Sequence, residues 1–523
     1  MICTLASAQG VNRVVQVENN YISELPGVQK MDLPMSVPDS LLHFDYDFDY
    51  SVFETPFKGA YEFTPYNVFV QPDASVYDGS KFYLKAGAGY SLHPVLKFVA
   101  APVVRKDRVF SIYNDGSGFI GRYAGNPHSV YGREETFTGY EYSDRLGAEL
   151  RWMSPKYYAS ADVNYNIIGA GDDPVKKNSV TNAVRFTASL EPAVYANFFY
   201  SIKVGAGLFE SNGSAETKAR GFNTFAAVTL GQGQGDGRFL ADLYVGLDRM
   251  DLDIGYGAQT NNYPLYSVTP HYDFELGSAK IRAGVRLDYT DQFSVAPDVR
   301  VDANVLDGRL NLFAGADGGQ TLVDFVSLKS AFRRAEGSHC VNGISREYFN
   351  IFAGLGGHSG NVFQYGLTLG YRNYGSTPVE TLYGYRYASV ARLYLDGRFS
   401  VKSERVDVDA NFSVGENWLF SDVDMFAPAL FSGDIRAVYN WNKRIYAGLR
   451  AEGRTKRPGH FLGSESEISL PGYADLGVTA EYKVTSKFGL WLESGNLLCQ
   501  DIWVTPLYAE TDPYFTAGIC LKF

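Results

Sequence analysis

Charged side chains recur at alternate positions in many segments of the sequence, and a site could be built from them. In residues 298–305, Arg300 and Asp302 alternate with Val299 and Val301. In a β-strand the charged pair would therefore share one face and the valines the other. The same pattern places further charged residues on one face of their segments: Arg392, Asp396, Arg398, Asp407, Asp409, Arg450, Glu452, Asp475 and Glu481. Such a face could line the path of a hydrophilic solute or bind a plugging segment. Alternatively, it forms a solvated ladder of cross-strand pairs.

Metal chemistry has no comparable signal. Asp45, Asp47 and Asp49 have the spacing that begins a calcium loop. However, Tyr50 stands where that loop requires Gly, and Pro56 stands where it requires Glu. We therefore expect no metal site.

Catalytic and cofactor sites are not indicated either. His271 and His358 lie near predicted strand ends, but no Ser/His pair or paired carboxylate accompanies them. The glycines at 231, 233, 235 and 237 precede no predicted helix, so they indicate a turn rather than a nucleotide-binding loop. We expect no catalytic residue, no cofactor and no enzyme.

The composition favours a large β structure. The 523 residues include 54 Gly, 38 Tyr and 35 Phe, and aromatic residues make up 15%. No run of about 18 uncharged apolar residues occurs, which argues against membrane-spanning helices. The aromatic content argues against disorder. Because 58 acidic residues outnumber 47 basic ones, the chain lacks the basic surface of a nucleic-acid-binding protein.

Segments of about 10 to 14 residues with alternating apolar and polar positions follow one another along most of the chain. The clearest are 473–484, 404–415 and 298–305, each with one charge-free face. A soluble sheet would show the same alternation. The connections, however, alternate between short and long, as periplasmic turns and extracellular loops do in outer-membrane barrels. We therefore predict an all-β fold, a single transmembrane antiparallel β-barrel of outer-membrane type.

The strand count follows from these connections. With Phe523 at the periplasmic end, the short turns extend back to 92–94, and longer outer loops lie between them, including 106–135 and 318–346. The total is about 22 strands, an even number as a bacterial barrel requires. A barrel of this width holds a plugged lumen. The N-terminal segment, an inward-folded loop such as 318–346 or 106–135, or a second protein must fill it.

The N-terminal part divides into two segments ahead of the barrel. Residues 1–8 close on Ala6, Ser7 and Ala8, which is typical of the end of a secretory signal peptide. An ordinary N-terminus is the alternative. Residues 9–57, including the alternating aromatic and acidic segment 41–53, are expected to be periplasmic or luminal, and residues 58–523 to form the barrel.

The last strand ends on an aromatic residue. Phe515, Ile519, Leu521 and Phe523 share one face of it. An aromatic-ended amphipathic strand resembles the signal that the outer-membrane barrel-assembly machinery reads.

The cysteines leave two alternatives. Cys340 and Cys499 fall in predicted outer loops, where they either form a disulfide or remain thiols. Cys520 faces the lumen of the last strand, too far from those loops to pair with them.

Residues 473–523 resemble the closing hairpin and last strand of TonB-dependent receptor barrels of Bacteroidetes-type bacteria. The matching residues are Tyr473, Asp475, Leu476, Asn496, Leu497 and Phe523. Those receptors carry a globular plug domain ahead of the barrel, for which residues 9–57 are expected to be too few.

The resemblance implies an integral protein of the bacterial cell outer membrane. Its expected role is solute transport, porin-like or receptor-like, or that of the barrel subunit in an outer-membrane complex. The alternative is a scaffold barrel without transport of its own, closed by a lipoprotein or another outer-membrane subunit. The expected partners also include outer-membrane lipids and the barrel-assembly machinery, but no nucleic acid.

Overall fold

A computed structural model describes residues 81–105, 107–126, 136–171, 178–193, 198–213, 217–234, 237–255, 257–306, 309–335, 337–360, 362–420, 425–460 and 469–523. The predicted signal peptide, the segment 9–57 and the predicted start of the barrel at residue 58 lie outside the described residues.

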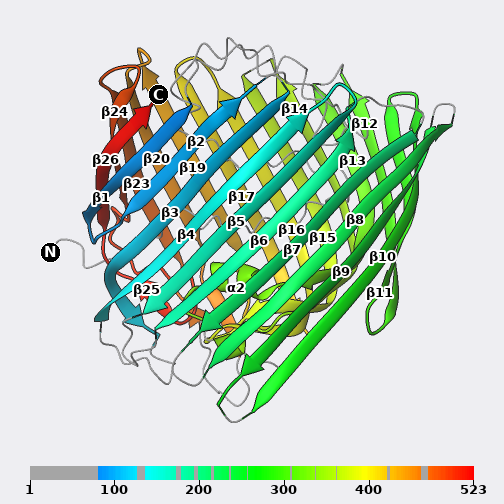
Figure 1. Ribbon diagram of the computed structural model, residues 1–523, viewed down its shortest axis with the longest axis horizontal. Helices are drawn as coiled ribbons and strands as arrows, with labels where there is room; N and C mark the ends of the chain where they lie inside the picture. The colour runs from blue at the N-terminus through cyan, green and yellow to red at the C-terminus, as the bar shows by residue number, and fades with distance from the viewer. Residues whose placement is uncertain are drawn as a thin grey trace.

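Antiparallel strands form a closed barrel (Figure 1). The sheet has 23 strands, and all but the three-residue β25 form the wall, which leaves 22. β1 (Phe82–Tyr90) pairs with both β2 (Val95–Val104) and β26 (Tyr514–Lys522), so the ring has no free edge. Closure satisfies the backbone hydrogen-bonding groups that hydrocarbon cannot. The predicted fold class and the count of about 22 strands are confirmed.

The other wall strands follow in chain order, each antiparallel to its neighbours. They are β3 (Arg108–Gly125), β4 (Thr136–Met153), β5 (Tyr157–Gly171), β6 (Ser179–Pro192), β7 (Phe198–Asn212), β8 (Lys218–Gln234), β9 (Gly237–Asp253), β10 (Ala258–Leu276), β11 (Ala279–Tyr289), β12 (Phe293–Val305), β13 (Leu310–Val323), β14 (Gly343–Ser359), β15 (Phe363–Glu380), β16 (Tyr385–Lys402), β17 (Val406–Leu419), β19 (Phe431–Trp441), β20 (Ile445–Arg454), β23 (Tyr473–Lys483) and β24 (Phe488–Gly495).

Smaller elements lie in the connections at the outer end, opposite Phe523. β18 (Met425–Phe426), β21 (Arg457–His460) and β22 (Ser469–Leu470) form a separate small sheet, and β25 (Tyr508–Glu510) pairs with the outer end of β3. The helix α2 (Phe325–Ala331) and the 3-10 helix η2 (Gly337–His339) lie between β13 and β14. No helix in the described ranges is long and apolar enough to cross a membrane.

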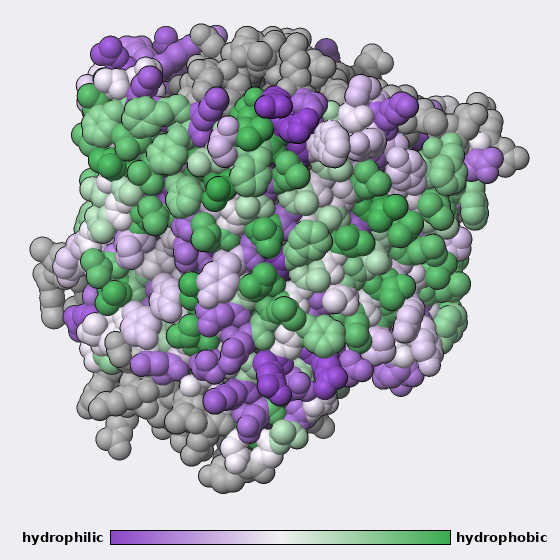
Figure 2. All heavy atoms as spheres, viewed as in Figure 1, coloured by the Kyte–Doolittle hydropathy of each residue, from purple (hydrophilic) through white to green (hydrophobic). Residues whose placement is uncertain are grey.

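Alternation along each strand separates the two faces of the wall. On β12, Val295, Val299 and Val301 are exposed on the outside, whereas Arg300 and Asp302 are buried inside. Figure 2 shows the resulting belt of hydrophobic residues between more hydrophilic margins. A wall with lipid outside and a polar interior explains the mean hydropathy of only -0.17, because the two halves of each strand cancel.

One predicted loop is wrong. The sequence predicts a long outer connection over 106–135, but β3 occupies most of it and pairs with β2 and β4 along its length. The extra strand reverses the end at which the earlier turn lies, so Leu92–Pro94 is at the outer end and not the periplasmic one. Alternation does not reveal β3 because Asn114, Gly116 and Gly118 take outward positions where apolar side chains are expected.

Candidate functional site

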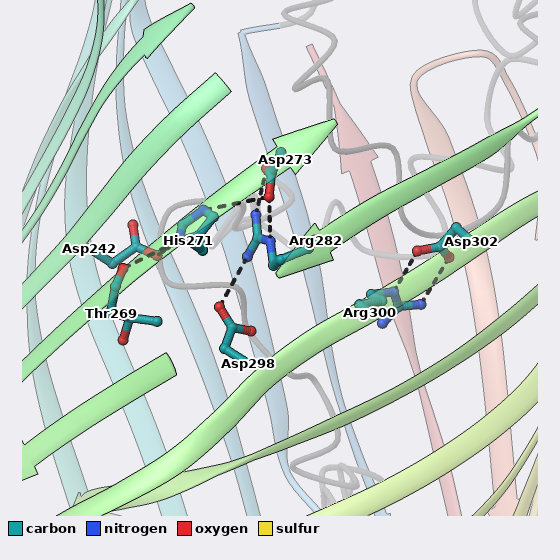
Figure 3. A network of polar contacts seen from close by, with 8 residues as sticks. All are labelled: Asp242, Thr269, His271, Asp273, Arg282, Asp298, Arg300 and Asp302. Carbon is teal, nitrogen blue, oxygen red and sulfur yellow. Dashed lines mark hydrogen bonds and ion pairs between the residues drawn. The ribbon is translucent and has the colours of Figure 1, made fainter. Parts of the chain in front are cut away.

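Charged residues from four neighbouring strands form a network on the inner wall (Figure 3). We call it the wall network. It consists of Asp242 on β9, Thr269, His271 and Asp273 on β10, Arg282 on β11, and Asp298, Arg300 and Asp302 on β12. Figure 3 shows these side chains pointing into the barrel.

His271 lies between two carboxylates. Its Nδ1 is 3.6 Å from Asp242 Oδ2, and its Nε2 is 3.9 Å from Asp273 Oδ1. Asp242 also accepts a hydrogen bond of 2.6 Å from the Thr229 hydroxyl. All four side chains are buried inside the wall, so the imidazole is held by its surroundings rather than by bulk water.

Arg282 links two strands of the network. Its Nε and Nη2 donate to the two oxygens of Asp273 over 2.9 and 3.1 Å, and its Nη1 lies 4.0 Å from Asp298 Oδ2. The strand register explains the clamp, because Asp273 and Arg282 are directly opposite each other on β10 and β11. Bidentate pairing of this kind fixes the guanidinium plane.

Arg300 is opposite Arg282 in the register, and its charge is balanced on its own strand. Its Nε and Nη2 donate to Asp302 over 2.8 and 3.2 Å. The guanidinium also lies 5.1 Å from the ring of Phe313 and 5.5 Å from that of Phe352. Each arginine of the network therefore has its own carboxylate, which removes the repulsion between them.

The other predicted residues lie farther round the wall. They are Arg392, Asp396 and Arg398 on β16, Asp407 and Asp409 on β17, Arg450 and Glu452 on β20, and Asp475 and Glu481 on β23. Arg450 donates to Glu452 over 2.7 Å, and Arg398 donates to Asn411 over 3.1 Å. Because β13 to β15 separate them from Arg300 and Asp302, the predicted residues form two groups. Their role in lining a solute path stays a prediction.

Sequence reasoning did not select the rest of the wall network. Asp242, Asp273, Arg282 and Asp298 were not among the predicted residues, and His271 was considered only as a catalytic candidate. The signal was present, because His271 and Asp273 alternate with Pro270, Tyr272 and Phe274 along β10. The proline and aromatic residues on the outward face obscured it.

A loop at the outer mouth folds back into the barrel. We call residues 324–335 and 337–342, which include α2 and η2, the cap. Phe325, Phe332 and Cys340 of the cap are fully buried, in one hydrophobic cluster with Phe209 and Met250 of the wall. Other outer loops add Leu382, Phe426, Leu470, Trp503 and Leu507 to the cluster. An inward-folded loop within 318–346 is therefore confirmed.

Polar contacts anchor both ends of the cap. Asp324 is the N-cap of α2, where it accepts from the backbone N–H of Ser327 over 3.0 Å and from Arg185 of β6 over 2.6 Å. At the other end, the Asn342 side-chain amide donates to Asp248 of β9 over 2.6 Å. The ring of Phe325 stacks on that of Phe209 with 4.8 Å between centroids.

Arg334 ties the middle of the cap to β4 and β5. Its Nε donates to Glu141 over 2.8 Å, and its other nitrogens donate to the carbonyls of Tyr140 and Gly171 over 3.0 and 3.2 Å. The guanidinium also lies 4.1 Å from the ring centre of Tyr123. The Arg334 and Glu141 side chains are only 3% and 6% exposed.

Cys340 is a free thiol in the cap, so the alternative of a Cys340–Cys499 disulfide is excluded. Burial raises the pKa of the Cys340 thiol to about 11. The thiol is therefore protonated at neutral pH and unreactive while the cap is closed.

The charged groups of the inner wall can bind or guide hydrophilic groups. Within the described ranges, no group of three or more His, Cys, Asp or Glu side chains could hold a metal ion. In the wall network most carboxylates and both guanidinium groups are engaged with each other. The wall therefore presents paired charges to the lumen.

No protein-family model and no curated protein matches the sequence. Solved structures do match its fold. The siderophore receptor PirA from Acinetobacter baumannii has a TM-score of 0.63 at 9% identity, over 85% of this chain and 80% of that one. The copper transporter OprC has a TM-score of 0.60 at 11% identity, over 85% and 80% of the two chains. The ferripyoverdine receptor of the Pseudomonas aeruginosa outer membrane has a TM-score of 0.62 at 10% identity, over 85% and 72%.

At these identities the likeness concerns the fold. The three proteins are two receptors and a transporter, and none of them is named as an enzyme. The closed ring, the strand count and the belt agree with it. The chain is thus a bacterial outer-membrane β-barrel with the architecture of the TonB-dependent receptor barrels.

Proposed function

We propose that this barrel is a gated receptor that admits a hydrophilic solute across the outer membrane. The observation that carries the proposal is the combination of a charged inner wall with a cap of the barrel's own chain buried among the strands and loops at the outer mouth. A polar inner face is suited to a lumen through which hydrophilic solutes pass. Such a lumen needs a gate, because an open channel of this width would breach the membrane.

Paired charges of both signs suit a solute that is itself charged or strongly hydrated. The solved structures with the same fold include a siderophore receptor and a copper transporter. This supports a metal chelate as the first class of solute to test. The residues 9–57, as a periplasmic or luminal segment, would close the opposite end.

A scaffold that needs a partner to close it is the weaker reading. The cap is built from this chain, and its hydrophobic cluster draws on strands and loops from β3 to β25. Closure of the outer mouth therefore does not require a lipoprotein.

Planar-bilayer conductance tests the proposal. We expect the purified protein to give little current, and a variant with residues 325–340 replaced by a short Gly-Ser linker to give large, stable channels. A matched variant with the exposed outer turn 290–292 replaced by Gly and Ser should remain as silent as the parent. If the cap-deleted barrel folds and is also silent, the lumen provides no continuous path and the proposal is wrong.

A further inference from the structure

A carboxylate and an amide take outward positions on β3 and β4, where Asn114 is 8% exposed and Asp144 is half-buried. Asn114 is opposite Leu146 in the register, and Asp144 is opposite Gly116. Leu146 is 43% exposed on the outer face. The alternate residues Tyr113 and Glu149 point inward, where the Tyr113 hydroxyl donates to Asp162 of the inner wall. Asn114 and Asp144 therefore belong to the outward set.

This pair interrupts the outward apolar residues of β3 and β4, in register with the first residues of β2. Asp144 is far from both ends of β4 (Thr136–Met153). Exposed apolar side chains surround the pair on four strands: Leu96, Ile112, Ile120, Leu150 and Tyr165. β3 and β4 lie on the face of the barrel seen in Figures 1 and 2.

Other outward charges occupy a different kind of position. Glu210, Arg249, Asp251 and Glu416 are on the outward face of β7, β9 and β17, within four residues of the outer end of each strand. Headgroups and water reach that margin. Asp144 lies eight residues from the outer end of its own strand, so its position along β4 differs from theirs and its charge calls for a separate explanation.

Hydrogen bonds already made by Asn114 and Asp144 use both donor hydrogens of the amide, so only acceptor atoms of the two side chains remain available. Asn114 Nδ2 donates to Asp144 Oδ1 over 2.8 Å and to the carbonyl of Leu96 over 3.3 Å, which uses both amide hydrogens. Asp144 Oδ2 and Asn114 Oδ1 can then only accept. Among the described residues, no Lys, Arg or His forms an ion pair with Asp144.

Two buried glycines of β3 pack beside the carboxylate. Asp144 Oδ1 lies over Gly116, in the place that a side chain there would occupy. Gly118 follows on the same face of β3, next to Pro94 and Tyr142. Asp144 itself is only half-buried on this outward face, so its carboxylate is open to a side chain from outside.

We propose that this surface, Asn114, Asp144, Gly116 and Gly118, binds a second membrane-spanning protein that presents a Lys or Arg side chain. A carboxylate toward lipid destabilises a barrel on its own, and a cationic donor from a partner would neutralise it. A two-fold contact centred on this pair is disfavoured, because acceptors of one copy would then meet acceptors of the other. The phosphate groups of lipids carry the wrong sign.

Photo-crosslinking in outer membranes of the source bacterium tests the proposal. A photoreactive residue replaces Leu146, beside the pair, or Leu369, which is 54% exposed on the outward face of β15 and serves as the control. We expect a protein adduct at position 146 and not at 369, with its crosslinked peptide in a membrane-spanning segment that contains Lys or Arg. Asp144→Leu should lower the adduct yield at least tenfold.

Three results would overturn the proposal: lipid adducts alone at position 146, equal protein adducts at both positions, or a crosslinked peptide from a second copy of this chain. Denaturant unfolding of the purified barrel in vesicles excludes a merely structural role. Asp144→Leu should unfold at the same or a higher denaturant concentration than the parent, and unfolding at a lower one would contradict us. If the leucine variant does not assemble, Asp144→Asn, which keeps the shape and removes the charge, replaces it in both the crosslinking and the unfolding measurements.

Discussion

Replacing Arg334 with Met should open the cap. The buried guanidinium donates to Glu141 and to two wall carbonyls. Removing one member of a buried ion pair costs about 3 to 5 kcal/mol, mainly because the other charge stays desolvated. In the open cap Glu141 is hydrated, so this cost falls on the closed state alone. At about 1.4 kcal/mol per factor of ten, the open population should rise roughly a hundredfold to a few thousandfold.

Cys340 reports this population directly. It is fully buried in the closed cap, where its pKa is raised to about 11 by burial, so a maleimide reacts only after the cap opens. The labelling rate of Cys340, followed at the peptide level to separate it from Cys520, should therefore increase by the same factor in Arg334→Met.

Two further variants sharpen the test. Arg151 donates to Glu149 over 2.6 and 2.8 Å on the inner wall of β4, so Arg151→Met is a matched loss of an arginine–glutamate pair outside the cap. It should leave Cys340 labelling unchanged. Adding Glu141→Gln to Arg334→Met removes the unpaired charge and should restore most of the protection. Parental labelling in a correctly folded Arg334→Met barrel, or equal acceleration in Arg151→Met, would refute the role of Arg334.

Three other outcomes are expected. Asp273→Ala should lower the stability of the barrel by about 3 to 5 kcal/mol, because Arg282 remains buried without its bidentate partner; denaturant titration in vesicles measures the loss, and adding Arg282→Met should recover part of it. Burial lowers the pKa of His93 in the turn between β1 and β2, so the unfolded chain gains a proton that the folded one resists, and stability should fall as pH drops below about 6.5. The unfolding midpoint of His93→Gln should depend less on pH between 7.5 and 5.5, and an unchanged dependence would count against this assignment. Phe523→Ala should reduce the heat-modifiable, folded band in membranes more than Phe515→Ala does, and equal amounts would show that the terminal aromatic has no special role in assembly.

The wall of the barrel was predictable because lipid and lumen impose opposite requirements on alternate residues. Val299 and Val301 must face one solvent and Arg300 and Asp302 the other, so a single strand contains the signal. β3 lacked that signal at Asn114, where a polar residue faces outward. The same departure that concealed the strand in the sequence marks the proposed docking surface.

The contacts of the site were less accessible to sequence reasoning. Arg334 meets Glu141 across 193 positions of the chain, and nothing in the local pattern of either residue indicates the other. The loop 318–346 could be expected to fold inward, but its partners depend on which side chains the strand register places at the outer mouth. Arg282 and Asp273 are closer in sequence, yet their pairing also follows from the register of β10 and β11.

The seam between the first and last described wall strands also constrains when the barrel can form. The backbone N–H of Phe523 donates to the carbonyl of Phe82 over 2.9 Å, and the Phe82 N–H donates back to Phe523 over 2.8 Å. The two strands of the seam thus stay hydrogen-bonded as far as Phe523, through contacts between positions more than four hundred residues apart. Loop closure over such a separation is entropically costly and slow. Until β26 pairs with β1, the sheet has two unpaired edges, which are able to pair with other chains.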